Sequence, residues 1–334
     1  MANYVVIGGG IAATQAAQVI RSLADDDPIT LVAEEERPFY TRPLLADFVA
    51  GRIPETRLWR SFEAEAEAKD ISLLTGRKAV GIDREARLLR LSDGQTVPYD
   101  RLLVATGVKP TLPAIPGADL DGVTTFFSYA DALKLGKWAQ SAHTAVVVGR
   151  GLQGVELTRA LRLRGLQVTM IVPDESPWFP ALFEIKGELM EQALVEHGVN
   201  VVPLDSPVEL IERAGHVNAV RTRQGRELKG EIVGFALDQR PTVDFLVGTG
   251  VSLAEGIVVD AHLKSTDDRI YAAGDVAQIE QDGKRRPIGY GWLRALAQGE
   301  VAARNMCGQS VTVAIGDESE AHTLYGMGLL ARWS

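Results

Sequence analysis

The sequence predicts an α/β protein made of two units of the βαβ type, each built on a parallel sheet. Two glycine-rich turns of the same design support this prediction: YVVIGGGIAA at residues 4–13 and AVVVGRGLQGVE at residues 145–156. Each turn follows a short apolar run rich in β-branched residues, which is typical of a buried strand, and precedes a stretch with helical character. One such turn is weak evidence, but two in the same chain predict two dinucleotide-binding sites.

The first unit starts at the N-terminus. Its expected elements are, in order, a strand (4–7), a turn (8–10), an alanine-rich helix (11–23), a parallel strand (29–33), a second helix (61–69), a hairpin (88–99) and a further strand (102–105). Ser61 is placed as the N-cap of the second helix, whose glutamates are expected to form a solvated face. Asp93-Gly94 supplies the tight turn of the hairpin.

A proline-rich connection, KPTLPAIPG at residues 109–117, indicates a crossing between domains. The βαβ pattern then restarts, with expected strands at 145–148, 168–172, 199–202 and 231–237 and helices at 155–164 and 185–197. From about residue 243 the chain leaves this second unit, because the strand 257–259 and the segment RIYAAGD at 269–275 have no obvious place in it. A helix is expected to follow at 292–306. Residues 309–334 are irregular.

The composition restricts the function mainly by excluding classes of partner and of chemistry. The chain has 334 residues, enough for two cores, and a net charge of -9 without a block of like charges, which argues against a nucleic acid or an anionic membrane surface as partner. It contains no apolar run long enough to span a bilayer, so a cytoplasmic location is expected. The single cysteine, Cys307, excludes an internal disulfide, a CxxC pair and a cysteine-based metal site. No metal is expected, and any redox chemistry would come from a bound cofactor.

Both turns carry the spacing of a dinucleotide fingerprint. The first glycine makes the tight turn, the second lets the backbone approach the pyrophosphate, and the third lets helix and strand pack closely, while the phosphates sit at the helix N-terminus. These positions are Gly8, Gly10 and Ala13 in the first copy and Gly149, Gly151 and Gly154 in the second. A tight turn without a ligand is the alternative interpretation.

An acidic residue after the second strand normally binds the adenosine ribose. Glu34 has this position in the first unit, with a surface glutamate of the run EEE as the alternative. In the second unit the strand ends at Val172, and Asp174 and Glu175 follow only after a proline. This weakens the case for NAD there.

The chain resembles the pyridine nucleotide-disulfide oxidoreductases, flavoproteins that bind two dinucleotides, and within them the branch of rubredoxin reductases, ferredoxin reductases and NADH-nitrite reductase flavin domains. The matching segments are GGGIAA, FYTRPLLADFVAG (39–51), LLVATG (102–107), GRGLQGVE, RIYAAGDVA (269–277) and GWLRALAQGEVAARNMCG (291–308). The resemblance implies an FAD-binding domain made of residues 1–115 and 245–308, an inserted Rossmann-like NAD(P)H-binding domain at 116–244, and a short tail at 309–334 in place of the usual interface domain.

The resemblance also implies site residues. For FAD these are Gly8, Gly10 and Ala13 at the pyrophosphate, Glu34 at the ribose, Arg42 and Pro43 in the segment that lines the flavin, Ala105, Thr106 and Gly107 in the ATG turn, Gly274 and Asp275 at the ribityl chain, and Trp292 beside the flavin ring. Two of these have plain structural alternatives: Asp275 as a helix N-cap and Trp292 as a core tryptophan.

For NAD(P) the resemblance implies Gly149, Arg150, Gly151, Gly154, Glu156 near the nicotinamide carboxamide, and Asp238. A partly exposed helix glutamate is the alternative for Glu156. Asp238 departs from the usual GxRP pattern, and a carboxylate there would repel phosphates or alter the ribose contacts. Arg150 has three alternative roles: a residue that favours the 2′-phosphate of NADPH, a partner of a neighbouring acid, or a plain surface charge. The choice between NADH and NADPH therefore stays open.

Two departures bear on the chemistry. TRPLLADF has no cysteine opposite the flavin, which argues against a disulfide reductase, and Asp47 stands where some relatives carry a lysine close to the flavin. We therefore expect an FAD-dependent NAD(P)H oxidoreductase that passes hydride to FAD and electrons to a small redox protein (rubredoxin or ferredoxin) or to a fused or partner centre of the nitrite-reductase type. The alternatives are an NAD(P)H oxidase or quinone reductase, and a non-catalytic flavin-binding subunit whose second site is degenerate. Glu156 and Trp292 are candidates near the reacting rings, and no firm catalytic residue is expected.

Overall fold

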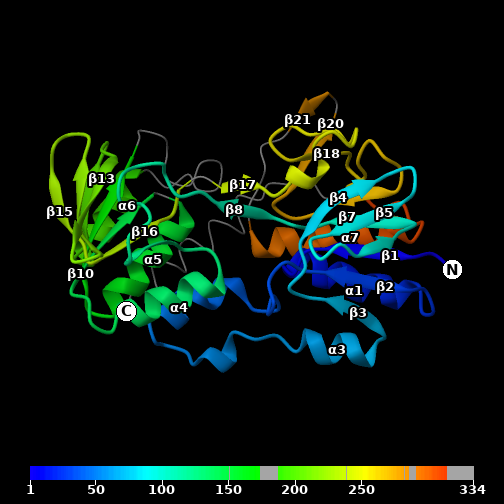
Figure 1. Cartoon of the computed structure of the whole chain (residues 1–334), viewed down its shortest axis with the longest axis horizontal. Coiled ribbons are helices and arrows are strands. Elements are labelled where there is room, and N and C mark those ends of the chain that lie inside the picture. The colour runs from blue at the N-terminus through cyan, green and yellow to red at the C-terminus, as the bar shows by residue number, and fades with distance from the viewer. Residues whose placement is uncertain (150, 174–186, 238, 282, 286–290, 314–334) are drawn as a thin grey trace. The chain divides into compact units, whose positions relative to one another are not determined.

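The computed structural model describes residues 1–149, 151–173, 187–237, 239–281, 283–285 and 291–313. It divides into two compact units (Figure 1). Unit 1 comprises residues 1–40, 59–109 and the described residues from 240 onward, and unit 2 comprises residues 41–58 and the described residues of 110–239. The segment 41–58 belongs to unit 2 because its short helix α2 (Leu45–Val49) packs against two helices there. The predicted domains 1–115 with 245–308, and 116–244, stay predictions.

Unit 1 is built on a five-stranded parallel sheet. Its strands, in spatial order, are β19 (Ile270–Ala272), β7 (Arg101–Val104), β1 (Tyr4–Ile7), β2 (Ile29–Val32) and β3 (Ile71–Leu74). Its helices are α1 (Ile11–Leu23), α3 (Phe62–Ala68) and α7 (Trp292–Met306). Every side chain of β1 is buried, as expected for a central parallel strand covered on both faces.

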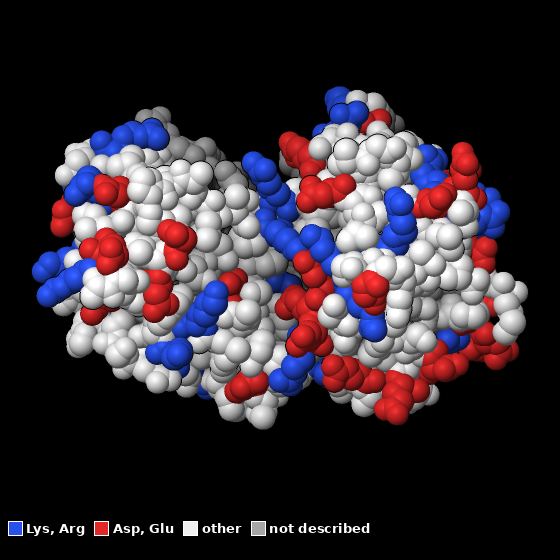
Figure 2. Space-filling model, in the orientation of Figure 1, with Lys and Arg blue, Asp and Glu red and all other residues white. Residues whose placement is uncertain are grey.

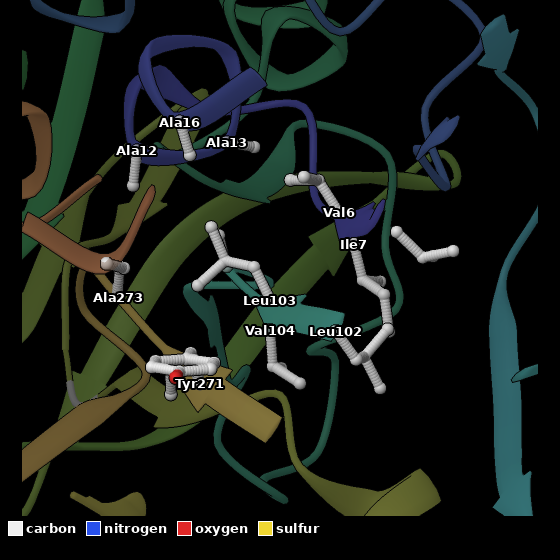
Figure 3. Packing of buried hydrophobic residues seen from close by; sticks show 14 of the residues in the cluster. Val6, Ile7, Ala12, Ala13, Ala16, Leu102, Leu103, Val104, Tyr271 and Ala273 are labelled. Carbon is white, nitrogen blue, oxygen red and sulfur yellow. The ribbon is translucent and has the colours of Figure 1, made fainter. Parts of the chain in front are cut away.

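The core of unit 1 forms where α1 packs on this sheet. Figure 3 shows Val6 and Ile7 of β1 and Leu102 to Val104 of β7 together with the small side chains Ala12, Ala13 and Ala16 of α1. α7 lies against the same helix, and Gly299 of α7 faces the backbone of Ala12. A run of alanines and a glycine thus allow two helices to approach closely around the start of α1.

Gly299→Ala is expected to destabilise the protein, although glycine to alanine inside a helix usually stabilises by roughly 0.5–1 kcal/mol. A Cβ at Gly299 would lie 2.3 Å from the carbonyl oxygen of Ala12, so one helix must shift. We expect a loss of about 1–3 kcal/mol in the free energy of unfolding, measured by urea titration. The control is Gly136→Ala in α4 (Tyr129–Trp138), where a Cβ meets nothing within 4 Å and the usual gain is expected. Equal gains in both variants would contradict the prediction.

Smaller sheets complete unit 1. They are β4-β5-β6 (Ala79–Asp83, Leu88–Leu91, Thr96–Pro98) and β18-β20-β21 (Ile257–Val259, Ala277–Gln281, Lys284–Arg285), with the short helix η3 (Asp244–Leu246). The hairpin expected around Asp93-Gly94 is confirmed as β5-β6. Ser61 does precede α3, but it makes no capping bond, because its hydroxyl donates to the Glu65 carboxylate instead.

Acidic side chains cover the outer face of α3. Figure 2 shows them in the part of unit 1 where Figure 1 places this helix. Glu63 and Glu67 are exposed, and Phe62 and Ala66 face the core. The solvated glutamate face expected from the sequence is therefore confirmed.

Unit 2 is built on a second five-stranded parallel sheet. Its strands, in spatial order, are β12 (Asn200–Pro203), β11 (Gln167–Val172), β10 (Thr144–Val148), β16 (Ile232–Phe235) and β9 (Val123–Thr125). Its helices are α4, α5 (Leu152–Leu163) and α6 (Gly187–Glu196), with η1 (Arg42–Leu44), α2 and η2 (Glu55–Arg57) from the segment 41–58. An antiparallel sheet, β13-β14-β15 (Pro207–Arg213, His216–Thr222, Glu227–Lys229), covers a stretch to which the sequence assigns no element.

The two parallel sheets share the arrangement of the four strands around the glycine turn and differ in the fifth, because β19 comes last in sequence in its sheet and β9 comes first in its sheet. Each carries its glycine turn after the central strand, β1 or β10, whose next strand in sequence lies on one side and a later strand on the other. All strands of the unit 2 sheet lie between β7 and β19 in sequence, and the connecting segments pair as β8 (Val108–Pro110) and β17 (Gln239–Pro241). The predicted fold class, two Rossmann-like α/β units with one inserted into the other, is confirmed. Within the described ranges, no helix is long and apolar enough to cross a membrane.

Candidate functional site

The first glycine turn joins β1 to α1 in unit 1. Gly8 has φ +135°, and a Cβ there would stand 2.2 Å from the carbonyl oxygen of Ala105. Gly10 precedes the helix, and a Cβ there would meet nothing within 4 Å. Ala13 is fully buried. The turn therefore presses against the end of β7 on one side and leaves open space at the start of α1 on the other.

The second glycine turn repeats this geometry in unit 2. Gly149 has φ +139°, and a Cβ there would stand 2.2 Å from the carbonyl oxygen of Ala236. Gly151 precedes α5 and again has nothing within 4 Å of a built Cβ, while Gly154 would bring its Cβ to 3.0 Å from the Gly149 carbonyl oxygen. The three glycines have the three tasks of the fingerprint: a tight turn against the end of a neighbouring strand, an open approach, and tight packing of helix on strand.

At both turns the helix N-terminus is left without a side-chain cap. Gly10 and Gly151 are the N-cap residues and offer no side chain, and neither α1 nor α5 has an acidic residue in its first turn. The first N–H groups of a helix need an acceptor, and the helix dipole favours a negative one. Each turn thus has the steric and electrostatic requirements of a phosphate-binding site.

Glu34 follows β2 and is half-exposed. Its carboxylate accepts a hydrogen bond from Lys109 Nζ at 2.5 Å, and the exposed side-chain fractions of the two residues are 46% and 51%. An ion pair this exposed contributes little to stability, about 0–1 kcal/mol. Two hydroxyl groups of a ligand can therefore replace Lys109 as the partner of Glu34 at a small cost in free energy.

Two hydrogen bonds fix the ATG turn after β7. The Thr106 hydroxyl donates to the carbonyl oxygen of Thr242 at 2.8 Å, and the carbonyl of Gly107 accepts from the Thr242 amide at 3.0 Å. This turn includes Ala105, whose carbonyl faces Gly8. The turn predicted from LLVATG is therefore held against both the glycine turn and the chain that returns after β17.

The AAGD turn after β19 is held by a residue that the sequence analysis missed. Gln298 of α7 is almost fully buried, and its Oε1 accepts a hydrogen bond from the amide of Gly274 at 2.8 Å. An uncharged polar residue among the small residues of RALAQGEVAAR is the signal that points to it. The N-cap alternative for Asp275 is wrong, because strand β20 begins at Ala277 and no helix starts before Trp292 in the described part of this stretch.

Arg42 and Pro43 lie in the short helix η1 of unit 2. The Arg42 guanidinium donates from Nη1 to the carbonyl oxygen of Phe127 at 2.6 Å and stands 4.2 Å from the centroid of the Phe127 ring. Both contacts stay inside unit 2. Arg42 and Pro43 thus belong to unit 2, whereas Gly8, Glu34 and the ATG turn belong to unit 1.

Two buried charged residues lie on α5. Glu156 is 9% exposed, so the alternative of a partly exposed helix glutamate is wrong. Arg159, three residues on and thus on the same face, is 2% exposed and donates from Nη2 to Asp47 Oδ1 of α2 at 2.7 Å. Asp47, which stands where some relatives carry a lysine, is therefore paired with a buried arginine.

Trp292 is the first residue of α7 and packs, partly buried, against the core of unit 1. Arg150 and Asp238, which the resemblance assigns to the second dinucleotide, lie outside the described residues. No cluster of histidine, cysteine and acidic side chains within the described ranges has the arrangement of a metal site.

Comparison with known proteins agrees with this geometry. The model of the family described as pyridine nucleotide-disulphide oxidoreductase matches residues 2–299. Rhodocoxin reductase of Rhodococcus erythropolis is 33% identical over 84% of this chain and 66% of its own length. The ferredoxin–NAD(+) reductase component of the biphenyl dioxygenase system of Paraburkholderia xenovorans is 30% identical over 92% of this chain and 75% of its own length. Among solved structures, an NAD-dependent persulfide reductase from A. fulgidus superposes with a TM-score of 0.86 at 30% identity.

This chain belongs to the pyridine nucleotide-disulphide oxidoreductase family, because the family model covers most of it and both dinucleotide fingerprints are formed. The chain spans about two thirds of the length of rhodocoxin reductase and 60% of that of the persulfide reductase, which aligns with 93% of this chain. The relatives are named as NAD(+)-linked or redox-protein reductases, which are oxidoreductase enzymes.

Proposed function

We propose that this protein is an FAD-dependent NAD(P)H oxidoreductase that passes electrons to a small redox protein. FAD would bind at the glycine turn of unit 1 and the nicotinamide nucleotide at that of unit 2. The observation that carries the proposal is the repetition of one turn geometry, with φ +135° at Gly8 and +139° at Gly149 and the same 2.2 Å approach to a strand-end carbonyl. Two sites of equal construction support two dinucleotides in preference to a degenerate second site.

The residues of each turn fit the proposed ligand. The open space beside Gly10 and Gly151 is where a pyrophosphate approaches, and the uncapped N–H groups of α1 and α5 supply donors. For FAD we propose Gly8, Gly10, Ala13, Glu34, Ala105, Thr106, Gly107, Gly274, Asp275 and Trp292, with Arg42 and Pro43 from unit 2. For NAD(P)H we propose Gly149, Gly151, Gly154 and Glu156, together with Arg150 and Asp238.

Bound at the turn of unit 1, FAD would supply hydride-accepting and electron-transferring chemistry. The protein's part is to hold and orient the two cofactors. Gln298 fixes the turn that carries Asp275, and Thr106 fixes the turn beside Gly8. Rigid turns of this kind favour the hydride step by positioning, and no side chain has to move a proton in that step.

A disulfide-reductase mechanism lacks its cysteines. The only cysteine in the sequence, Cys307, follows α7, and the segment 41–58 has none. Burial raises the pKa of the Cys307 thiol, a hydrogen bond with Tyr4 opposes this shift only in part, and the field of Asp27 adds a smaller increase. A thiol kept protonated is a poor nucleophile. The names of the relatives therefore support a redox-protein acceptor of the rubredoxin or ferredoxin type, or a nitrite-reductase-type centre.

Anaerobic stopped-flow mixing with NADH, and separately with NADPH, tests the proposal. We expect the purified protein to show flavin absorption bands that disappear with at least one nucleotide and return on addition of an oxidised ferredoxin or rubredoxin. Bands that neither NADH nor NADPH bleaches would refute the oxidoreductase proposal. Recovery with oxygen or a quinone but with no redox protein would favour the oxidase or quinone-reductase alternative.

A further inference from the structure

Arg60 of unit 1 reaches the first glycine turn from a distant part of the chain. Its amide donates to the carbonyl of Phe39 at 2.8 Å, which fixes its backbone just before α3. Its Nη1 donates to the hydroxyl oxygen of Thr14 at 2.7 Å. Thr14 is fully buried in α1, and its hydroxyl lies 3.3 Å from the carbonyl oxygen of Gly10. Two hydrogen bonds thus connect this guanidinium to the N-cap of α1.

The same guanidinium lies close to the start of α7. Its central carbon is 5.9 Å from the centroid of the Trp292 ring, and Trp292 opens α7. The first turns of the two helices, IAAT in α1 and WLRA in α7, contain no acidic residue. Because helix N-termini carry partial positive charge, Arg60 adds a cation where the local field already favours an anion.

No carboxylate of the described residues forms an ion pair with Arg60. Burial lowers the pKa of its guanidinium, and the field of Glu65 opposes the shift. A partly buried cation beside two positive helix ends is unfavourable by itself, so the arrangement is explained if an anion completes it. One of its five N–H donors bonds Thr14, and the planar fork that remains suits the oxygens of a phosphate.

We propose that Arg60 is a further FAD-binding residue, held by Thr14 and directed at the diphosphate group of the cofactor at the first glycine turn. The inference rests on the proposed function, because it needs FAD in unit 1. It gives a ligand-binding role to a residue in the segment WRSFEAEAEAK, in which the acidic face of α3 is the conspicuous feature. Arg60 would complement the uncapped amides of α1 with a full positive charge.

The test is FAD affinity, measured by quenching of flavin fluorescence on titration of the apoprotein at low and high salt. Arg60→Gln is expected to raise the Kd for FAD about 10- to 100-fold, the loss of one charge-assisted contact, and to flatten its salt dependence. Arg60→Lys keeps the charge but loses the fork, and a smaller increase is expected. The matched control is Arg87→Gln, which removes an exposed arginine of the same unit that pairs with Asp100, and no change is expected.

Riboflavin, which has no phosphate, distinguishes the diphosphate from the ring. Its affinity should be equal in wild type and Arg60→Gln, and an equal loss for riboflavin and FAD would overturn the assignment to the diphosphate. Wild-type protein that binds no FAD would refute the proposed function. Wild-type protein that binds FAD with the same Kd as Arg60→Gln would overturn only the present inference. If Arg60→Gln does not fold, Arg60→Lys takes its place in the test. A Kd for FAD equal to that of the wild type, in an Arg60→Lys protein with native circular dichroism, would likewise overturn the present inference.

Discussion

Gly149→Val is expected to abolish reduction by NAD(P)H while FAD stays bound. The new Cβ would stand 2.2 Å from the backbone carbonyl of Ala236, and the φ of +139° is one that valine avoids. The turn must therefore open, and the amides at the start of α5 leave their places. Strain of this kind costs about 1–3 kcal/mol before any contact is lost, so we expect nicotinamide affinity to fall by about 100-fold or more. The measurement is the nucleotide dependence of flavin bleaching in stopped flow.

Gly151→Ala is the informative companion variant. A Cβ there meets no protein atom within 4 Å, so unit 2 should fold normally and keep its thermal transition. Nicotinamide affinity should still fall, because the methyl group occupies the space through which the pyrophosphate approaches. Retained flavin bands in both variants serve as the internal control for unit 1. Normal bleaching kinetics in Gly149→Val would show that the second turn binds no nucleotide.

Of the single substitutions proposed, Asp47→Asn is expected to cause the largest loss in the free energy of unfolding. It removes the negative charge from the ion pair with Arg159, which is 2% exposed and whose Nε and Nη1 are also buried without an acceptor among the described residues. Breaking a buried pair from one side leaves an uncompensated charge and typically costs about 3–5 kcal/mol. Urea unfolding followed by circular dichroism measures the change, and the midpoint should fall with an unchanged slope.

The double variant Asp47→Asn/Arg159→Met tests the electrostatic cause. Methionine is apolar and unbranched and fills the space of the aliphatic stem of arginine, so removal of both charges should restore most of the stability lost in Asp47→Asn. Asp268→Asn, which breaks the exposed pair with Lys264, is the matched control and should change stability by at most about 0.5 kcal/mol. A double variant no more stable than Asp47→Asn would contradict the electrostatic explanation and indicate lost packing.

The elements that the sequence predicts best are those with a strong local pattern. The strand 4–7 and the helices 11–23 and 292–306 have the predicted bounds, because buried β-branched runs and helical apolar faces are visible in a short window. The sheet β13-β14-β15 has no such signature, since exposed and buried residues are mixed along its strands and its pairing has bulges. The helix α4 contains Gly136 and several charged residues, which weakens its periodicity.

The candidate site likewise has a part that the sequence predicts and a part that it does not. Both glycine turns follow from residue order, because their backbone geometry depends on residues within one turn of the chain: a glycine where φ is positive, and an open glycine before a helix. The hydrogen-bond partners of long polar side chains do not follow from residue order. Gln298 meets Gly274, Arg42 meets Phe127 and Arg159 meets Asp47 across 24, 85 and 112 residues of sequence.

Residue order alone is enough to derive the two βαβ units, their glycine turns and the family, since each depends on interactions close in the chain. Only the folded arrangement decides that the segment 41–58 packs on α4 and α5, that Asp47 is neutralised by a buried arginine, and that Arg60 stands beside Thr14. The physical reason is that the contact of a flexible charged side chain depends on which elements become neighbours and on how much water they exclude. Both are properties of the packed tertiary structure.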